Sequence, residues 1–272
     1  MAAVTDNVDS GDQIRVSVDD RGVARIEINR PQRKNAMNDV VSGTIVRSLR
    51  EWADRDDIRV VVIDGAGGSF SSGADIGGFM EAASGNAGGR MNPDQAHGFI
   101  SGGSELARAV RAVRAPVIAS VDGAAAGVGA SLALAADLIY ATERSYFLLS
   151  FVNIGLMPDG GATMSVATSI GRARANAMAL LGEKLPAAEA FDAGLVTKVV
   201  ADRAALDETV DAAVAKLAAT SPRSLRLTKA ALDAHTMSGL EPALERELKG
   251  QTELLQSPEF QAAIAAFLGA KR

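Results

Sequence analysis

The fold of this chain is decided by residues 115–163, which read APVIASVDGAAAGVGASLALAADLIYATERSYFLLSFVNIGLMPDGGAT. The pattern predicts a buried strand at 116–121, a glycine- and alanine-rich turn, and a helix of small residues at 128–136. Small residues let two backbones, or a backbone and a ligand, approach closely, and the first N–H groups of a helix bind negatively charged oxygens. A second glycine-rich turn, at 155–161, carries one carboxylate, Asp159. The stretch therefore predicts an anion-binding turn with a single acid nearby.

The composition is that of a globular protein, with 47% hydrophobic and 22% charged residues among 272. A formal net charge of −5 argues against a nucleic-acid-binding surface, which needs a basic face. The absence of cysteine and the wide separation of His97 and His235 argue against a metal site. No apolar run reaches the roughly 18 residues of a membrane span, and the polar N-terminus is unlike a signal peptide. We therefore expect a cytoplasmic protein that binds no metal, membrane or nucleic acid.

Before the deciding stretch, the chain alternates strands with glycine-rich turns and helices. Residues 1–12 carry almost no apolar pattern and are expected to form a disordered tail. Residues 13–18 and 23–29 alternate in strand fashion, and the continuous apolar run at 59–63 is typical of a parallel strand covered on both faces. A glycine-rich turn follows at 65–76. This rhythm predicts an α/β fold that binds its ligand at the strand ends.

Helices are predicted where apolar residues recur every three or four positions. Asn38 is expected to cap a helix that runs to about Trp52. The last quarter of the chain, 201–272, reads as purely helical without a compact polar constellation, so we expect it to cover the core and contact neighbouring subunits. Eight glycines interrupt residues 77–104, which predicts a mobile loop that covers the ligand. His97 lies in this loop and is expected to have an ordinary surface role.

Several residues invite motif interpretations that their surroundings do not complete. The first glycine cluster has Phe70 where a dinucleotide-binding G-x-G-x-x-G needs its third glycine, and no P-loop lysine follows. Ser131 lies near a G-x-S-x-G nucleophile elbow but falls one turn inside the predicted helix, which argues against a serine hydrolase. For Asp75 a helix N-cap is the favoured interpretation. For Asp159 a cap of the helix at 162–170 stays open beside a chemical role.

Six distinct motifs occur along the chain: RPxxxNAMN at 30–38, FSSGADI at 70–76, APVIAxVDGxAxGVG at 115–129, ADLIYA at 136–141, IGLMPDGG at 154–161 and EAFDAGLV at 189–196. Taken together, from about residue 13 onward, they resemble the crotonase superfamily, also called enoyl-CoA hydratase/isomerase. The resemblance implies a ββα-spiral core over 13–200 and a helical trimerisation region over 201–272, assembled as a homotrimer or a dimer of trimers. It also implies acyl-CoA thioester substrates and no separate cofactor, because coenzyme A is part of the substrate.

The resemblance further implies roles for individual residues. The backbone N–H groups of Ala74 and Val128 would bind the thioester oxygen, where two fixed donors stabilise an enolate. Ser131 and Phe151 stand where hydratases carry two glutamates, so hydration by the two-glutamate mechanism is not expected. The residues expected along coenzyme A and the acyl group are Lys34, Ala36, Ser72, Gly73, Asp75, Ile76, Ser131, Phe151, Phe267 and Lys271.

Isomerase relatives keep a single carboxylate at the position of Asp159. An allylic isomerisation needs one acid/base, which takes a proton at C2 and returns it at C4. We therefore predict an enoyl-CoA isomerase, acting on a Δ3,Δ2 double bond or on a ring, with Asp159 as acid/base. Apolar neighbours, expected to be Leu148, Phe151 and Met157, would raise the pKa of Asp159. The alternatives are an enoyl-CoA hydratase with an atypical water site and a non-catalytic acyl-CoA-binding protein.

Overall fold

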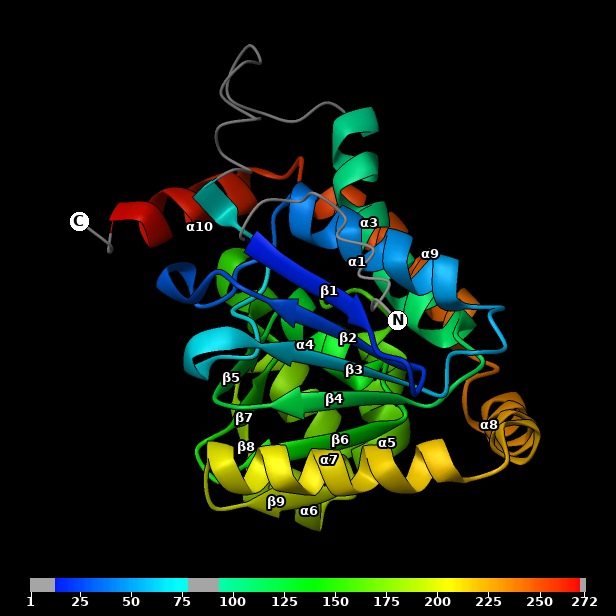
Figure 1. The fold of residues 1–272 in the computed structure, drawn as a ribbon. Coiled ribbons are helices and arrows are strands. Elements are labelled where there is room, and N and C mark those ends of the chain that lie inside the picture. Colours follow the sequence, from blue (N-terminus) through cyan, green and yellow to red (C-terminus); the bar gives the residue numbers. More distant parts are fainter. Residues whose placement is uncertain (1–12, 78–92, 270–272) are drawn as a thin grey trace.

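A six-stranded sheet forms the centre of the computed structural model, which describes residues 13–77 and 93–269 (Figure 1). Its strands stand in the order β1-β2-β3-β4-β6-β9. They are β1 (Ile14–Val18), β2 (Val23–Ile28), β3 (Val60–Gly65), β4 (Val117–Val121), β6 (Leu138–Thr142) and β9 (Lys198–Val200). β1 and β2 form an antiparallel hairpin, and every other neighbouring pair runs parallel. Strands that alternate with helices confirm the predicted α/β class.

Both faces of the sheet are covered, as the apolar run in β3 predicted. Side chains alternate between the two faces of a strand. Val60 and Val62 of β3 pack in a cluster with apolar side chains of α7 (Arg203–Ala219), which lies along the sheet (Figure 1). Val61 and Ile63 belong to the main hydrophobic core on the other face. The sheet is therefore a buried platform that holds the turns at its strand ends.

A smaller sheet carries the turn that decides the fold. Its strands, in spatial order, are β5 (Ala124–Ala126), β7 (Tyr146–Leu148) and β8 (Lys184–Pro186). β5 leads through Gly127 into α4 (Val128–Leu134), which confirms the predicted turn and small-residue helix. Gly127 has a φ of 53° and a ψ of −134°, a conformation that glycine adopts without steric cost. The chain therefore enters α4 by a sharp turn that other residues would strain.

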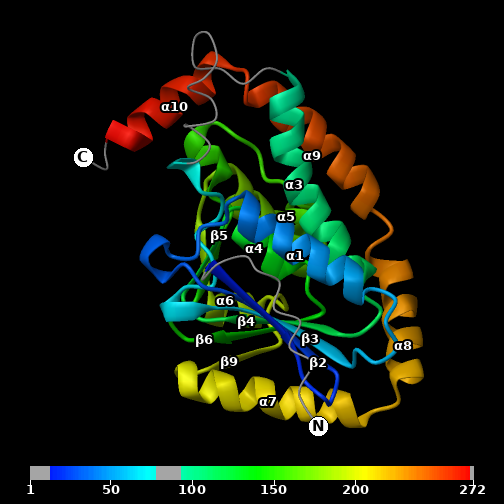
Figure 2. The ribbon, with the colours of Figure 1, turned by 45° about the horizontal axis from the view of Figure 1, so that its top comes forward.

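Helices from distant parts of the chain pack together beside the central sheet (Figures 1 and 2). α1 (Asp39–Trp52) packs on α3 (Pro93–Ala112), and α3 packs on α9 (Leu240–Leu254). α10 (Pro258–Gly269) packs on the short 3-10 helix η4 (Ser150–Ile154). The last helices of the chain thus lie next to segments about 100 or more residues earlier in the sequence, and together they enclose the pocket described below.

Helix α3 shows that the loop prediction for 77–104 was wrong in its second half. The helix begins at Pro93 and contains three glycines, while residues 78–92 lie outside the described part of the chain. Each glycine costs a helix interior about 1 kcal/mol relative to alanine. The packing of α3 against α1 and α9 offsets this cost, because tertiary contacts supply most of the stability of a helix in a protein. His97 on this helix is exposed, in agreement with a surface role.

The C-terminal quarter is helical, as predicted. The remaining helices are α5 (Ala162–Leu180), α6 (Ala187–Asp192) and α8 (Pro222–Thr236), with the 3-10 helices η2 (Pro31–Arg33) and η3 (Ala66–Gly68). Assembly into a trimer or a dimer of trimers through 201–272 stays a prediction, and the expected tail, residues 1–12, lies outside the described residues. Among the helices described, none is both long enough and apolar enough to cross a membrane.

Candidate active site

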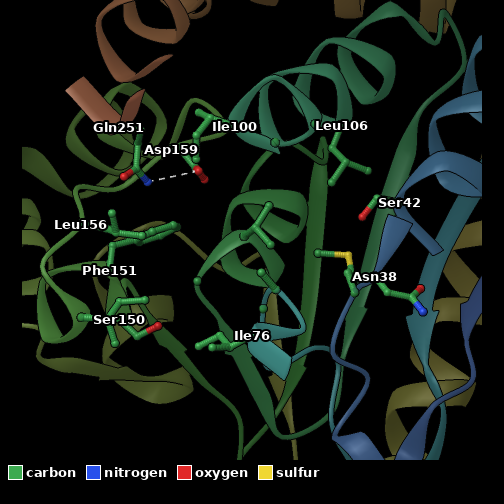
Figure 3. Close-up of a pocket in the computed structure, with 18 of the residues that line it drawn as sticks. Asn38, Ser42, Ile76, Ile100, Leu106, Ser150, Phe151, Leu156, Asp159 and Gln251 are labelled. Carbon is green, nitrogen blue, oxygen red and sulfur yellow. Dashed lines mark hydrogen bonds between the residues drawn. The ribbon is translucent and has the colours of Figure 1, made fainter. Parts of the chain in front are cut away.

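A pocket opens between two glycine-rich turns, at 65–76 and 123–127, together with η4 and the helices α3, α9 and α10 (Figure 3). Its apolar wall is made by Met37, Ile76, Ile100, Leu106, Phe151, Ile154, Leu156, Phe260 and Ile264. Polar side chains lie at two sides of it: Asp159 and Gln251 on one, Asn38 and Ser42 on the other (Figure 3). An apolar chamber with a few placed polar groups is typical of a small-molecule binding site.

The two glycine-rich turns touch each other at this pocket. Isolated β-bridges tie the first turn to its neighbours, and one of them pairs Ser71 with Ala125 of β5. A Cβ atom on Gly73 would lie 2.9 Å from the carbonyl oxygen of Ala126. The backbones approach this closely only because Gly73 has no side chain. The close approach brings the first residue of α4 and the end of the first turn to one pocket.

The backbone N–H groups of Ala74 and Val128 belong to two residues that line this pocket. Val128 is the first residue of α4, so its N–H group has no acceptor within the helix. In the part of the chain that the structure describes, neither N–H group has a hydrogen-bond partner. Two unpaired donors at one pocket suit the predicted oxyanion-binding pair, although the binding of a thioester oxygen between them stays a prediction.

The side chain of Asp159 is buried at the edge of the same pocket, with only 6% of the residue exposed. Its Oδ2 accepts a hydrogen bond of 3.3 Å from Nε2 of Gln251, and its Oδ1 is buried without a partner among the described residues. Burial and the negative charge of Glu247 raise the pKa of Asp159 to about 7, against the opposing effect of the Gln251 hydrogen bond. The predicted rise of this pKa is therefore confirmed. The apolar neighbours at the pocket include Phe151 and Leu156, but not Leu148 or Met157.

The helix-cap interpretation of Asp159 is wrong. The N-cap of α5 is Gly161, whose side-chain-free backbone has a φ of 79°. The free N–H groups at this helix end donate instead to the buried carboxylate of Glu247 on α9, from Gly161 at 2.7 Å and from Thr163 at 3.0 Å. A cap supplied by a residue far along the chain leaves the side chain of Asp159 free to face the pocket.

Ser131 and Phe151, the two positions where hydratases carry glutamates, differ in their surroundings. Phe151 lines the pocket and is 7% exposed. Ser131 does not line it: its Oγ donates to the backbone carbonyl of Asp159 at 2.7 Å. The expected contact of Ser131 with the acyl group is thus replaced by support of the turn that carries Asp159. Neither position presents a carboxylate, and Phe151 adds apolar surface.

Residues expected along coenzyme A lie at and beside the pocket. Ser72, Gly73 and Ile76 line it, whereas Lys34 is exposed and Ala36 is buried, both outside its lining. The backbone carbonyl of Lys34 accepts the N–H group of Ser72 at 2.9 Å, which ties this loop to the first glycine-rich turn. Contacts of these residues with coenzyme A stay predictions.

Asp75 has a structural partner. Its Oδ2 accepts a hydrogen bond of 2.8 Å from Nη2 of Arg30, and both side chains are 13% exposed. Burial alone would raise the pKa of Asp75, but the hydrogen bond and charge of Arg30 and the N–H group of Gly77 together lower it. The bond from Gly77 agrees with the favoured cap interpretation.

The C-terminal residues expected at coenzyme A are only partly within the described structure. Phe267 lies in α10, but its side chain is outside the described part, as is Lys271 altogether. Among the described residues, no group of three or more histidine and carboxylate side chains gathers to hold a metal ion.

Helix α9 contributes to the site in a way that its sequence pattern did not predict. Glu247 and Gln251 are both fully buried, although the C-terminal quarter was expected to hold no polar constellation. A signal was present: these residues continue the apolar face of α9 at helical spacing after Ala243 and Leu244. Polar residues on the buried face of a helix need partners, which here lie 86 and 92 positions earlier in the chain.

Comparison with known proteins places this geometry in a family. Residues 19–272 match the family described as enoyl-CoA hydratase/isomerase. The chain is 33% identical to 1,2-epoxyphenylacetyl-CoA isomerase of Escherichia coli K12 (93% of this chain, 94% of that one) and 36% identical to a probable enoyl-CoA hydratase of Rhodobacter capsulatus (91% of each). A crystal structure of an enoyl-CoA hydratase from Mycobacterium avium subsp. paratuberculosis K-10 superposes with a TM-score of 0.84 at 40% identity, covering 95% of this chain and 96% of that one. These matches confirm the crotonase-like fold, and the chain belongs to the enoyl-CoA hydratase/isomerase family.

Proposed function

We propose that this protein is an enoyl-CoA isomerase that uses Asp159 as its single acid/base. One observation carries the proposal: among the described residues that line the pocket, Asp159 is the buried carboxylate, and the other acid, Asp39, is exposed. Syn-hydration in this family uses a pair of glutamates, whereas a 1,3-proton shift uses one acid/base. The substrate is an acyl-CoA thioester with a movable double bond.

The proposed reaction begins with the thioester oxygen accepting hydrogen bonds from the N–H groups of Ala74 and Val128. Asp159 takes a proton from C2, which moves the electrons of the C–H bond into a dienolate whose charge rests on the thioester oxygen. The protonated Asp159 then returns the proton at C4, and the double bond ends between C2 and C3. A pKa of about 7 suits both steps, because an acid/base works best when its pKa lies near the working pH.

The apolar wall of the pocket favours proton transfer over the addition of water. Phe151 and Leu156 lie beside Asp159 in the pocket (Figure 3). A hydratase must hold a water molecule between polar groups, and apolar side chains supply none. The 33% identity to an enzyme named 1,2-epoxyphenylacetyl-CoA isomerase makes a ring-type isomerisation the second form of the same proposal.

The test compares isomerisation of 3-enoyl-CoA esters by wild type, Asp159→Asn and Asp39→Asn. Loss of a general base costs about 10²–10⁴ in rate, so Asp159→Asn should lose at least two orders of magnitude in kcat. Asp39→Asn is the matched control, because it removes an acid from the pocket rim only, and it should keep near-wild-type kcat. Equal rates for wild type and Asp159→Asn would refute the assignment.

A hydratase is the second candidate, since several relatives carry that name, among them the Rhodobacter protein at 36% identity. It predicts that purified wild-type protein hydrates crotonyl-CoA faster than it isomerises a 3-enoyl-CoA. A non-catalytic acyl-CoA-binding protein would instead bind CoA esters tightly without turning over either substrate. The two assays together separate the three possibilities.

A further inference from the structure

We infer that Gln251 is a positioning residue for this reaction: its amide holds Oδ2 of Asp159, so that Oδ1 is the oxygen that exchanges protons with the substrate. The inference rests on the proposed function, because it assigns the acid/base role to one atom of Asp159. It concerns α9, a helix outside all the sequence motifs that identified the site.

The geometry around the carboxylate separates its two oxygens. Gln251 is fully buried and lines the pocket, and its Nε2 lies 3.3 Å from Oδ2 of Asp159. Oδ1 of Asp159 and Oε1 of Gln251 are both buried without a partner among the described residues. Leaving buried polar atoms unpaired is costly, and a catalytic role is one of the established reasons for such an atom in a native structure. Figure 3 shows the two side chains meeting at one side of the pocket.

Oδ1 is also the carboxylate oxygen that lies nearer to the backbone of α3 at Gly103. A Cβ atom on Gly103 would lie 3.3 Å from Oδ1, closer than the 3.6 Å to Oδ2. Gly103 itself lines the pocket. Because Gly103 has no side chain, no Cβ atom of α3 presses against Oδ1.

The amide of Gln251 suits both protonation states of Asp159. When the carboxylate is ionised, the amide N–H donates to Oδ2. When Oδ1 carries the proton, Oδ2 is the carbonyl oxygen of the acid and still accepts the same N–H group. Gln251 therefore need not move during the reaction, and the proton is directed to Oδ1 in each step.

The charges around Asp159 leave Gln251 as its stabilising partner. The negative charge of Glu247 raises the pKa of Asp159, but the oxygens of Glu247 accept hydrogen bonds from the start of α5. The positive charge of Arg246, on the same helix, acts to lower the pKa of Glu247. On α3, Arg108 pairs with Glu241 of α9 at 2.9 Å. The lining residues described include no lysine, arginine or histidine.

The test measures the pH profile of kcat/KM for wild type, Gln251→Leu and the control Gln256→Leu. Gln256 lies two residues beyond the end of α9, where its amide donates to the carbonyl of Thr252 at 2.8 Å, and it does not line the pocket. We expect Gln251→Leu to lower kcat/KM at neutral pH by about tenfold to a hundredfold, because a misplaced base loses its attack geometry. Its acid limb should move to higher pH, because a hydrogen bond to the ionised form is lost. Gln256→Leu should change neither.

An NMR titration of ¹³C-labelled aspartate, with Asp159→Asn used to assign the signal, gives a readout independent of turnover. The Asp159 carboxyl should titrate at higher pH in Gln251→Leu than in wild type. If Gln251→Leu does not fold, Gln251→Glu keeps the shape of the side chain and should also move the titration to higher pH, by like-charge repulsion. An unmoved acid limb and titration in a folded variant would overturn the inference. Wild-type rates in Asp159→Asn would instead overturn the proposed function.

Discussion

Replacing Gly103 by alanine would place a methyl group against the proposed reactive oxygen of Asp159. The new Cβ atom would lie 3.3 Å from Oδ1 and 3.4 Å from Cγ, so that the carboxyl group must shift by a few tenths of an ångström. Gly103 lies in the helix α3 and has no left-handed φ, so alanine fits the backbone. Alanine in a helix interior gains about 0.5–1 kcal/mol over glycine, which the tight contact partly offsets. We therefore expect an unfolding free energy within about 1 kcal/mol of wild type.

The activity of Gly103→Ala should fall although the fold persists. A misplacement of about 1 Å in a catalytic geometry can cost on the order of 10²-fold in rate, and the methyl group also covers Oδ1. Gly102→Ala is the matched control: it lines the same pocket on the same helix, but its Cβ would meet nothing within 4 Å. Kinetics of 3-enoyl-CoA isomerisation and thermal unfolding of both variants are compared with wild type. Undiminished kcat/KM in Gly103→Ala would refute the assignment of Oδ1 as the base.

Three further predictions follow from the same site. The kcat/KM of wild type should rise with pH through about 7, because Asp159 acts as a base only when ionised, and a profile flat from pH 5 to 9 contradicts this. Val128→Pro should lose about 10²–10³ in kcat, the cost of one oxyanion donor, whereas Val128→Ala keeps its N–H group and should stay close to wild type. Proline is tolerated at the first position of a helix, so circular dichroism should show both variants folded. The pKa of Asp159 is raised from 3.8 unfolded to about 7 folded, so its contribution to stability is present below pH 3.8 and is lost as the pH rises through 7. Asparagine does not ionise, so the melting temperature of Asp159→Asn relative to wild type should be higher at pH 9 than at pH 5; an equal difference at both pH values would argue against a raised pKa.

Local sequence patterns predicted those parts of the structure that depend on neighbours in the chain. Asn38 caps α1 by accepting the N–H group of Val41 at 3.1 Å, as its residue type and position indicated. The continuous apolar run of β3 predicted a strand buried on both faces, because alternate residues had to meet apolar partners on each side. The turn before Val128 was predictable because glycine permits the sharp backbone turn and the close approach found there.

Partners that are distant along the chain were beyond these patterns. The start of α3 was not predicted because glycine lowers helix propensity. The helix is stabilised instead by its packing on α1 and α9. The roles of Glu247 and Gln251 were missed because a polar residue in an amphipathic helix normally faces water. Only the position of α9 in the structure shows that the side chain of Glu247 caps α5. The side chain of Asp159 therefore does not serve as the cap.

The cap of α5 by Glu247 has a consequence for the order in which the protein becomes active. During synthesis, Asp159 leaves the ribosome 92 residues before Gln251 does. Until α9 docks, the first turn of α5 lacks its acceptor, and Asp159 lacks both the hydrogen bond from Gln251 and the nearby charge of Glu247. The proposed acid/base therefore acquires its surroundings only when the last helices close over the core, and a nascent or C-terminally clipped chain would lack them.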